Sequence, residues 1–112
     1  MTPQRIQRER SKGWKKPEGA VYVGRPSKYG NDYCIEKTGK FYAIVNDKTG
    51  YIAYRPSRRT AAFHAVEMFE REQLPGMDVT ELAGKTIMCW CAVDMPCHGD
   101  PILRKANGKE TK

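Results

Sequence analysis

Three of the four cysteines and one of the two histidines fall within ten residues, in the segment CWCAVDMPCHGDP that spans residues 89–101. Cysteine sulfurs and histidine nitrogens are the ligands that tetrahedral zinc takes in proteins, so Cys89, Cys91, Cys97 and His98 are one candidate ligand set. The spacing is atypical of zinc, because the segment lacks a Cys-x-x-Cys pair and its last two candidates are adjacent. Zinc is therefore one interpretation of the segment, and no cofactor is favoured.

A reactive thiol is the second interpretation of the same segment. Cys97 comes just before a predicted helix, and the positive end of the helix dipole, with Arg25 or Lys28 across the site, would favour its thiolate. Adjacent side chains tend to diverge, so His98 would assist Cys97 through a bound water or through the substrate itself. Cys97 and His98 are the candidate catalytic residues, although whether the protein is an enzyme stays open. Packing is the third interpretation, and it suits Cys89 best.

The elements around this segment predict an α/β fold. Residues 20–24 (AVYVG) have the composition of a short strand, and the apolar run over residues 86–91 is typical of a strand buried on both faces. The runs KFYAIV and YIAY, joined by NDKTG, predict a β-hairpin, whereas Cys34 begins a polar segment and is interpreted as incidental. One helix is capped by Ser57 or Thr60 and stops at residues 75–76, and a second helix has Asp100 as its N-cap.

These elements combine into a small, single-domain, Rossmann-like layer with a short, partly parallel sheet, a β-hairpin insertion and two main helices. A strand that returns through a hairpin and a helix to a second strand favours parallel pairing of residues 20–24 with residues 86–91. Ligands of open parallel sheets bind beyond the carboxyl ends of the strands. The loops that follow the two predicted strands are therefore expected to meet at one edge of the sheet.

The two loops carry complementary chemistry. The loop RPSKYGN offers cationic and hydroxyl groups, and the second loop leads into a helix whose free N–H groups attract anions. Together they predict a site for a nucleotide or another phosphorylated small molecule. The candidate ligand-binding residues are Arg25, Ser27, Lys28, Asn31, Cys91, Gly99 and Asp100.

The positive charge of the chain is concentrated at its ends. The formal net charge is +7, with +5 in residues 1–16, +3 in residues 104–112 and −1 in the remainder. The chain is therefore divided into a basic N-terminal arm (1–19), an α/β domain (20–108) and a polar tail (109–112). Nucleic acid could bind through residues 5–16, and a host protein is another candidate partner. No apolar run is long enough to cross a membrane and no signal-peptide pattern is present, so we expect no membrane partner and a cytoplasmic location.

Two longer motifs, VYVGRPSKYGN and LAGKTIMCWCAVDMPCHGDPIL, resemble the phage-enriched domain-of-unknown-function family numbered 4326. The resemblance covers about residues 20–107 and implies a phage-encoded protein of the host cytoplasm, but it implies no activity. The chain departs from the family pattern at Tyr29, where Trp is usual, at NDYC, and in the hairpin around residues 41–54. The residues on motif positions are Gly24, Arg25, Pro26, Ser27, Lys28, Gly30, Asn31, Cys89, Trp90, Cys91, Cys97, His98, Gly99 and Asp100.

The leading functional hypothesis is binding, with processing left open, of a nucleotide or other phosphorylated ligand at the carboxyl ends of the strands. The alternative is a non-enzymatic module that binds nucleic acid or a host protein through its basic arm, with a loop that zinc could stabilise. A third interpretation is a structural cysteine cluster on a protein–protein adaptor.

Overall fold

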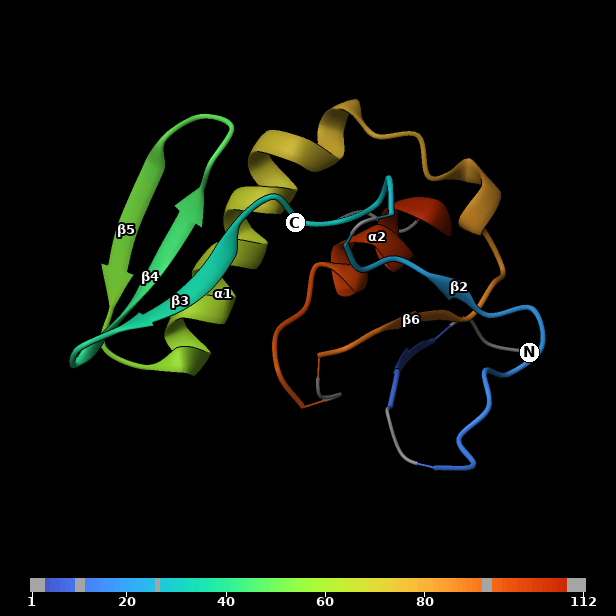
Figure 1. Ribbon diagram of the computed structural model, residues 1–112. Helices are drawn as coiled ribbons and strands as arrows, with labels where there is room; N and C mark the ends of the chain where they lie inside the picture. The colour runs from blue at the N-terminus through green and yellow to red at the C-terminus, as the bar shows by residue number, and fades with distance from the viewer. Residues whose placement is uncertain (1–3, 10–11, 26, 92–93, 109–112) are drawn as a thin grey trace.

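The computed structural model describes residues 4–9, 12–25, 27–91 and 94–108, and these residues form two small sheets with helices between and beside them (Figure 1). The first sheet has the order β1-β6-β2, and the second has the order β3-β4-β5. Helix α1 lies against the second sheet, and α2 lies against the first (Figure 1). The expected α/β class with a partly parallel sheet is confirmed.

The parallel sheet consists of β1 (Arg5–Gln7), β6 (Ile87–Cys89) and β2 (Val21–Tyr22). The expected parallel pairing of the strands near residues 20–24 and 86–91 is confirmed by the register of Val21 with Ile87. All three residues of β6 are buried, as the apolar run predicts.

Strand β1 lies within the segment that the sequence analysis assigned to the basic N-terminal arm (1–19). Residues 5–7, assigned to the basic N-terminal arm, pair in parallel with the other edge of β6. The sequence RIQ has one apolar residue and lies among charged neighbours, so its pattern alone does not indicate a strand. It becomes a strand because β6 offers an unpaired backbone edge, which parallel hydrogen bonds satisfy.

The antiparallel sheet contains the predicted hairpin and one further strand. The hairpin is β4 (Phe41–Asn46) and β5 (Tyr51–Arg55), and β3 (Cys34–Thr38) pairs with the other edge of β4. Strand β3 was not predicted, because CIEKT reads as polar. Figure 1 shows the sheet lying against α1, and Ile44 is fully buried on that face.

Helix α1 (Arg58–Met68) begins at Ser57, whose hydroxyl accepts a hydrogen bond from the Thr60 N–H, so the predicted Ser57 cap is confirmed. The helix continues through one π-helical turn, η1 (Phe69–Gln73), and one 3-10 turn, η2 (Leu74–Gly76), and therefore stops where the sequence predicts. A further 3-10 turn, η3 (Thr80–Leu82), precedes β6.

Helix α2 (Gly99–Ala106) begins immediately after the cysteine segment. Its N-cap is His98 and not Asp100, which lies in the first turn. The prediction of Asp100 as the N-cap is wrong because the helix already begins at Gly99, and the Asp100 carboxylate pairs with Arg5 at 2.9 Å. An acidic side chain in the first turn is still favoured by the helix dipole.

The apolar residues form two clusters, one for each sheet. The cluster under the parallel sheet includes Val23, Phe69 and Ile87, and it also contains Cys89 and Cys97. The other cluster lies between the antiparallel sheet and α1. Among the described residues, no helix is long and apolar enough to span a bilayer.

Candidate functional site

Three cysteine sulfurs converge at the carboxyl end of β6. Cys89 is the last residue of β6, Cys91 follows two residues later, and Cys97 comes from the loop before α2. The Sγ atoms of Cys89 and Cys91 are 3.7 Å apart, and all three Sγ atoms lie within 4.8 Å of one another. Cys89 and Cys97 are buried and Cys91 is partly exposed. The three sulfurs could therefore hold a metal ion, and we call them the sulfur cluster.

Cys89 packs in the apolar core, as the sequence predicts, and it also contacts another cysteine. Its side chain belongs to the apolar cluster under the parallel sheet, with 5% of the residue exposed. Its sulfur also contacts that of Cys91, because alternate residues of an extended chain share a face. Cys89 is therefore both a core residue and a member of the sulfur cluster.

His98 lies beside the cluster in a fixed orientation. Its Nε2 is 2.7 Å from the carbonyl oxygen of Val23, which can only accept a hydrogen bond, so Nε2 donates to it. Nδ1 is 3.7 Å from the Sγ of Cys97, and the ring meets Phe69 edge-on. The expectation that the side chains of Cys97 and His98 diverge is wrong, because the turn into α2 brings them together.

Arg5 is a site residue that the sequence did not reveal. Its side chain is 6% exposed, and Nε donates to Asp100 at 2.9 Å. Nη2 donates to the carbonyl of Met95 at 3.1 Å, and Nη1 lies 3.4 Å from the carbonyl of Cys91. Arg5 therefore links β1 to both ends of the loop that carries the cysteines.

The charge of Arg5 is retained although the side chain is buried. Burial acts against its positive charge, but the hydrogen bond to Asp100 and the negative potential of Cys97 outweigh burial and raise the pKa of Arg5. The cation beside Cys97 is therefore Arg5, in place of the Arg25 or Lys28 expected from the sequence. The close approach of Arg5 requires Gly99, because a Cβ atom there would lie 3.0 Å from Cδ of Arg5.

The three thiols titrate as one group. Hydrogen bonds from Cys91 and Cys97 stabilise a negative sulfur at Cys89 and lower the pKa of that residue. The pKa values of Cys91 and Cys97 are raised, chiefly because each thiol keeps its proton in a hydrogen bond toward Cys89, and further because burial and the neighbouring negative sulfur act against another thiolate. The cluster therefore forms one thiolate readily. A second or third thiolate forms only when a cation is present to offset the added negative charge.

The loop after β2 has its shape because of two glycines. A Cβ atom on Gly24 would lie 2.5 Å from the hydroxyl oxygen of Tyr22, which donates its proton to the carbonyl of Arg25 over 2.7 Å. A Cβ atom on Gly30 would lie 2.6 Å from Cγ of Arg25. The glycines of this motif therefore permit a tight loop.

Ser27 and Lys28, both predicted ligand-binding residues, contact other parts of the fold. The Ser27 hydroxyl accepts a hydrogen bond from the N–H of Tyr29 over 3.3 Å, and Lys28 pairs with Glu81 at 3.0 Å. Tyr29 is buried and donates its hydroxyl proton to the same Glu81 carboxylate. These contacts attach the loop to η3.

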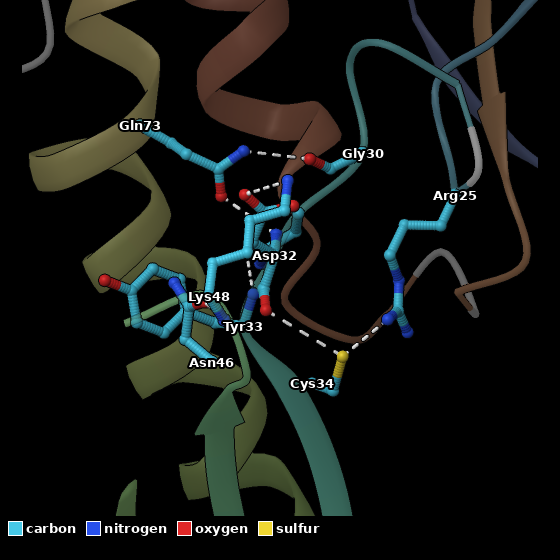
Figure 2. Close-up of polar contacts among 9 residues, drawn as sticks. Arg25, Gly30, Asp32, Tyr33, Cys34, Asn46, Lys48 and Gln73 are labelled. Atoms are coloured by element: carbon cyan, nitrogen blue, oxygen red, sulfur yellow. Dashed lines mark hydrogen bonds and ion pairs between the residues drawn. The ribbon is translucent and has the colours of Figure 1, made fainter. Parts of the chain in front are cut away.

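The segment after this loop is held between α1 and the antiparallel sheet, as Figure 2 shows. Gln73 donates to the carbonyl of Gly30 over 3.0 Å and accepts from the N–H of Asp32 over 2.8 Å. Arg25 points toward Cys34 and donates to its sulfur (Figure 2). Asn31 donates to the carbonyl of Ala65 over 3.2 Å, so this predicted ligand residue also fastens the loop to α1.

A cavity of about 400 Å³ opens between the carboxyl end of β6, the loop after β2, α1 and β3. Its lining includes all four cysteines, His98, two arginines and three aromatic side chains: Cys34, Cys89, Cys91, Cys97, His98, Arg25, Arg58, Tyr22, Tyr33 and Trp90. The sequence analysis did not predict several of these lining residues: Arg58, Tyr22, Tyr33, Trp90 and Cys34. Trp90 lies within the second of the two motifs that resemble the family. Of the predicted ligand-binding residues, three line the cavity: Arg25, Asn31 and Cys91. The other four do not line it: Ser27, Lys28, Gly99 and Asp100.

The chain was compared with protein families, curated proteins and solved structures. A family model described as "Domain of unknown function (DUF4326)" matches residues 6–108 of the 112 residues. The match reaches into β1, beyond the two motifs on which the resemblance was based. No curated protein and no solved structure matches the chain significantly.

Proposed function

Because the chain belongs to the DUF4326 family, whose description assigns no activity, we propose a function from its own site: Cys89, Cys91 and Cys97 bind a zinc ion in the wall of the cavity. The observation that carries the proposal is the mutual distance of the three sulfurs, all within 4.8 Å. Thiolates favour soft and borderline metals such as zinc over magnesium or calcium, which take oxygen ligands.

The sulfur positions agree with the size of a zinc site. A tetrahedral ion with zinc–sulfur bonds of about 2.3 Å places its sulfurs about 3.8 Å apart. The sulfurs of Cys89 and Cys91 are already 3.7 Å apart. Zinc would therefore need little movement of the strand end, and the main adjustment would fall on Cys97.

Two neighbouring groups support a cation-dependent cluster of thiolates. The N–H of Gly99, in the first turn of α2, lies 3.5 Å from the Sγ of Cys97 and can donate to it, which favours negative charge on that sulfur. Arg5 adds a positive charge behind the loop. Zinc would displace the thiol protons, so we expect zinc affinity to rise with pH as the second and third thiols ionise.

The test is metal content together with stability. Protein purified without added chelator is expected to contain one zinc per chain by elemental analysis, and Cys91→Ser is expected to lose it. Cys34→Ser is the matched control, because Cys34 lines the cavity but lies outside the sulfur cluster. Zinc at a hundredfold excess over its Kd should add about 2.7 kcal/mol to the unfolding free energy. Metal-free protein that zinc does not stabilise would refute the proposal.

A phosphorylated ligand, such as a nucleotide, is the second candidate, and the cavity lining favours it. Arg25 and Arg58 contribute two cationic side chains to the lining, and Tyr22 and Trp90 add aromatic surface on which a base could stack. Arg8 lies 5.0 Å from the ring centroids of both Tyr22 and Trp90 and adds positive charge at that wall. In this second candidate, the phosphorylated ligand binds inside the cavity and not at the tip of the RPSK loop.

A thermal-shift screen against nucleoside mono- and triphosphates tests the second candidate. A bound nucleotide should raise the Tm, and Arg58→Ala should reduce the shift. Lys28→Ala is the matched control, because Lys28 is paired with Glu81 and does not line the cavity. A screen without any shift, or a shift that Arg58→Ala leaves unchanged, would count against nucleotide binding here.

A further inference from the structure

All three residues of the sulfur cluster line the cavity, with Cys91 partly exposed and Cys89 and Cys97 buried. Cys89, Cys91 and Cys97 all belong to the cavity lining, together with Trp90 and Tyr22. Structural zinc sites are normally closed by four protein ligands, whereas sites that act on a ligand keep one position open. The position of the fourth donor therefore decides what kind of site this is.

The described residues supply three ligand atoms at suitable distances. The group of ligand atoms that lie within 4.8 Å of one another contains the three sulfurs and no histidine nitrogen, among the residues that the structure describes. A nitrogen ligand in a tetrahedral zinc site lies about 3.6 Å from every sulfur. His98 meets this distance at Cys97, where Nδ1 and Sγ are 3.7 Å apart, but its nitrogens do not lie within 4.8 Å of all three sulfurs.

His98 is also held away from coordination by its other nitrogen. Nε2 donates to the carbonyl of Val23 at 2.7 Å, and the ring packs edge-on against Phe69 with 6% of the residue exposed. Moving Nδ1 toward all three sulfurs would stretch this buried hydrogen bond and leave a carbonyl without its partner, which is costly. The ring is therefore better placed as a neighbour of the cluster, with Nδ1 beside the Sγ of Cys97.

We infer that the fourth coordination position of the metal opens into the cavity and accepts a ring nitrogen of an aromatic heterocycle, the chemical class of imidazoles and nucleobases. The inference rests on the proposed zinc site. A borderline-soft ion with three thiolates prefers a nitrogen donor to a phosphate oxygen. The aromatic surfaces of Tyr22 and Trp90 on the same cavity wall suit a flat ring.

The experiment uses the full chain loaded with cobalt(II) in place of zinc, because tetrahedral cobalt–thiolate sites have intense visible absorption that reports each ligand. Imidazole and adenine are titrated separately, and inorganic phosphate is the comparison probe. We expect both heterocycles to change the d–d spectrum saturably and phosphate to leave it unchanged. Trp90→Ala is expected to weaken adenine by about fivefold or more, the usual effect of losing one stacking partner.

The outcomes separate the two proposals. Absence of a cobalt–thiolate spectrum would overturn the metal site and this inference together. A three-thiolate spectrum that neither heterocycle alters would overturn the inference and leave the metal site intact. His98→Gln keeps an N–H for the Val23 carbonyl and is expected to retain the spectrum of the wild type. A changed spectrum in His98→Gln that imidazole restores would identify His98 as the fourth ligand and refute the open position.

Discussion

Replacement of Arg5 by methionine is the sharpest test of how the site is assembled. Methionine keeps the apolar stem of the side chain but removes the guanidinium that joins β1 to the cysteine loop and to α2. Among the described residues, two hydrogen bonds of normal length are lost, to Asp100 at 2.9 Å and to the carbonyl of Met95 at 3.1 Å. The contact with the carbonyl of Cys91 at 3.4 Å is long and adds little.

The magnitude follows from these contacts and from burial. Hydrogen bonds of a charged group contribute about 1.5–3 kcal/mol each, so two contribute about 3–6 kcal/mol. Part of this is offset, because the variant no longer buries a charge, and Asp100, 42% exposed, can turn to water. We expect the variant to lose about 2–4 kcal/mol of unfolding free energy. For a chain of 112 residues this corresponds to a Tm lower by about 10 °C or more.

Urea unfolding at pH 7, with Arg71→Met as the control, measures the effect. Arg71 is exposed, so the same chemical change there should cost less than about 0.5 kcal/mol. The Arg5→Met variant should also bind zinc more weakly, because the loop between Cys91 and Cys97 loses its anchor. Equal losses at Arg5 and Arg71, or an unchanged zinc affinity in a folded Arg5→Met protein, would refute the role given to β1.

Three further predictions concern separate parts of the fold. Gly99→Ala places a Cβ atom 3.0 Å from Cδ of Arg5 and 3.1 Å from Cδ1 of Ile87, so it should lower the unfolding free energy in urea by about 1–3 kcal/mol. Gly76→Ala is the control and should be close to neutral, because no atom lies within 4 Å of its new Cβ. Ser57→Ala removes the capping box of α1 and should cost about 1 kcal/mol by the same assay; an unchanged midpoint would show that the cap contributes nothing. Burial and the charge of Arg55 lower the pKa of His64, so its contribution to stability is complete above the unfolded value of about 6.5 and is lost as pH falls through the folded value. The unfolding free energy should therefore fall less between pH 7 and pH 5 in His64→Gln than in the wild type, and identical pH profiles would contradict this assignment.

Several features followed from the sequence because they depend on local pattern. The apolar run before Cys91 indicated a buried strand, and the returning connection through a hairpin and a helix favoured its parallel pairing with the strand near Val21. Ser57 marked the start of α1 because a hydroxyl at that position satisfies a free backbone N–H. The hairpin followed from two β-rich runs around a short loop that contains a glycine.

Other features depend on contacts between distant parts of the chain. Strand β1 exists because β6 has an edge to pair with, and Arg5 reaches Asp100, 95 residues away, through that pairing. Cys34 looked incidental, yet β3 places it on the same cavity as the other cysteines. Lys28 and Arg25 looked equivalent in their loop, but one pairs with Glu81 on η3 and the other points toward Cys34.

The ligand types that gather at the end of β6 follow from the sequence alone, because Cys89, Cys91, Cys97 and His98 are close along the chain. Their arrangement in space depends on contacts between distant parts of the fold. The turn into α2 brings the sulfur of Cys97 to those of Cys89 and Cys91, the carbonyl of Val23 holds His98 to one side, and a strand from the N-terminal region supplies the cation. The type of ligand atom depends on the residue itself. The distances and orientations between ligand atoms depend on how helices and strands pack together, and the sequence of one segment does not reveal that packing.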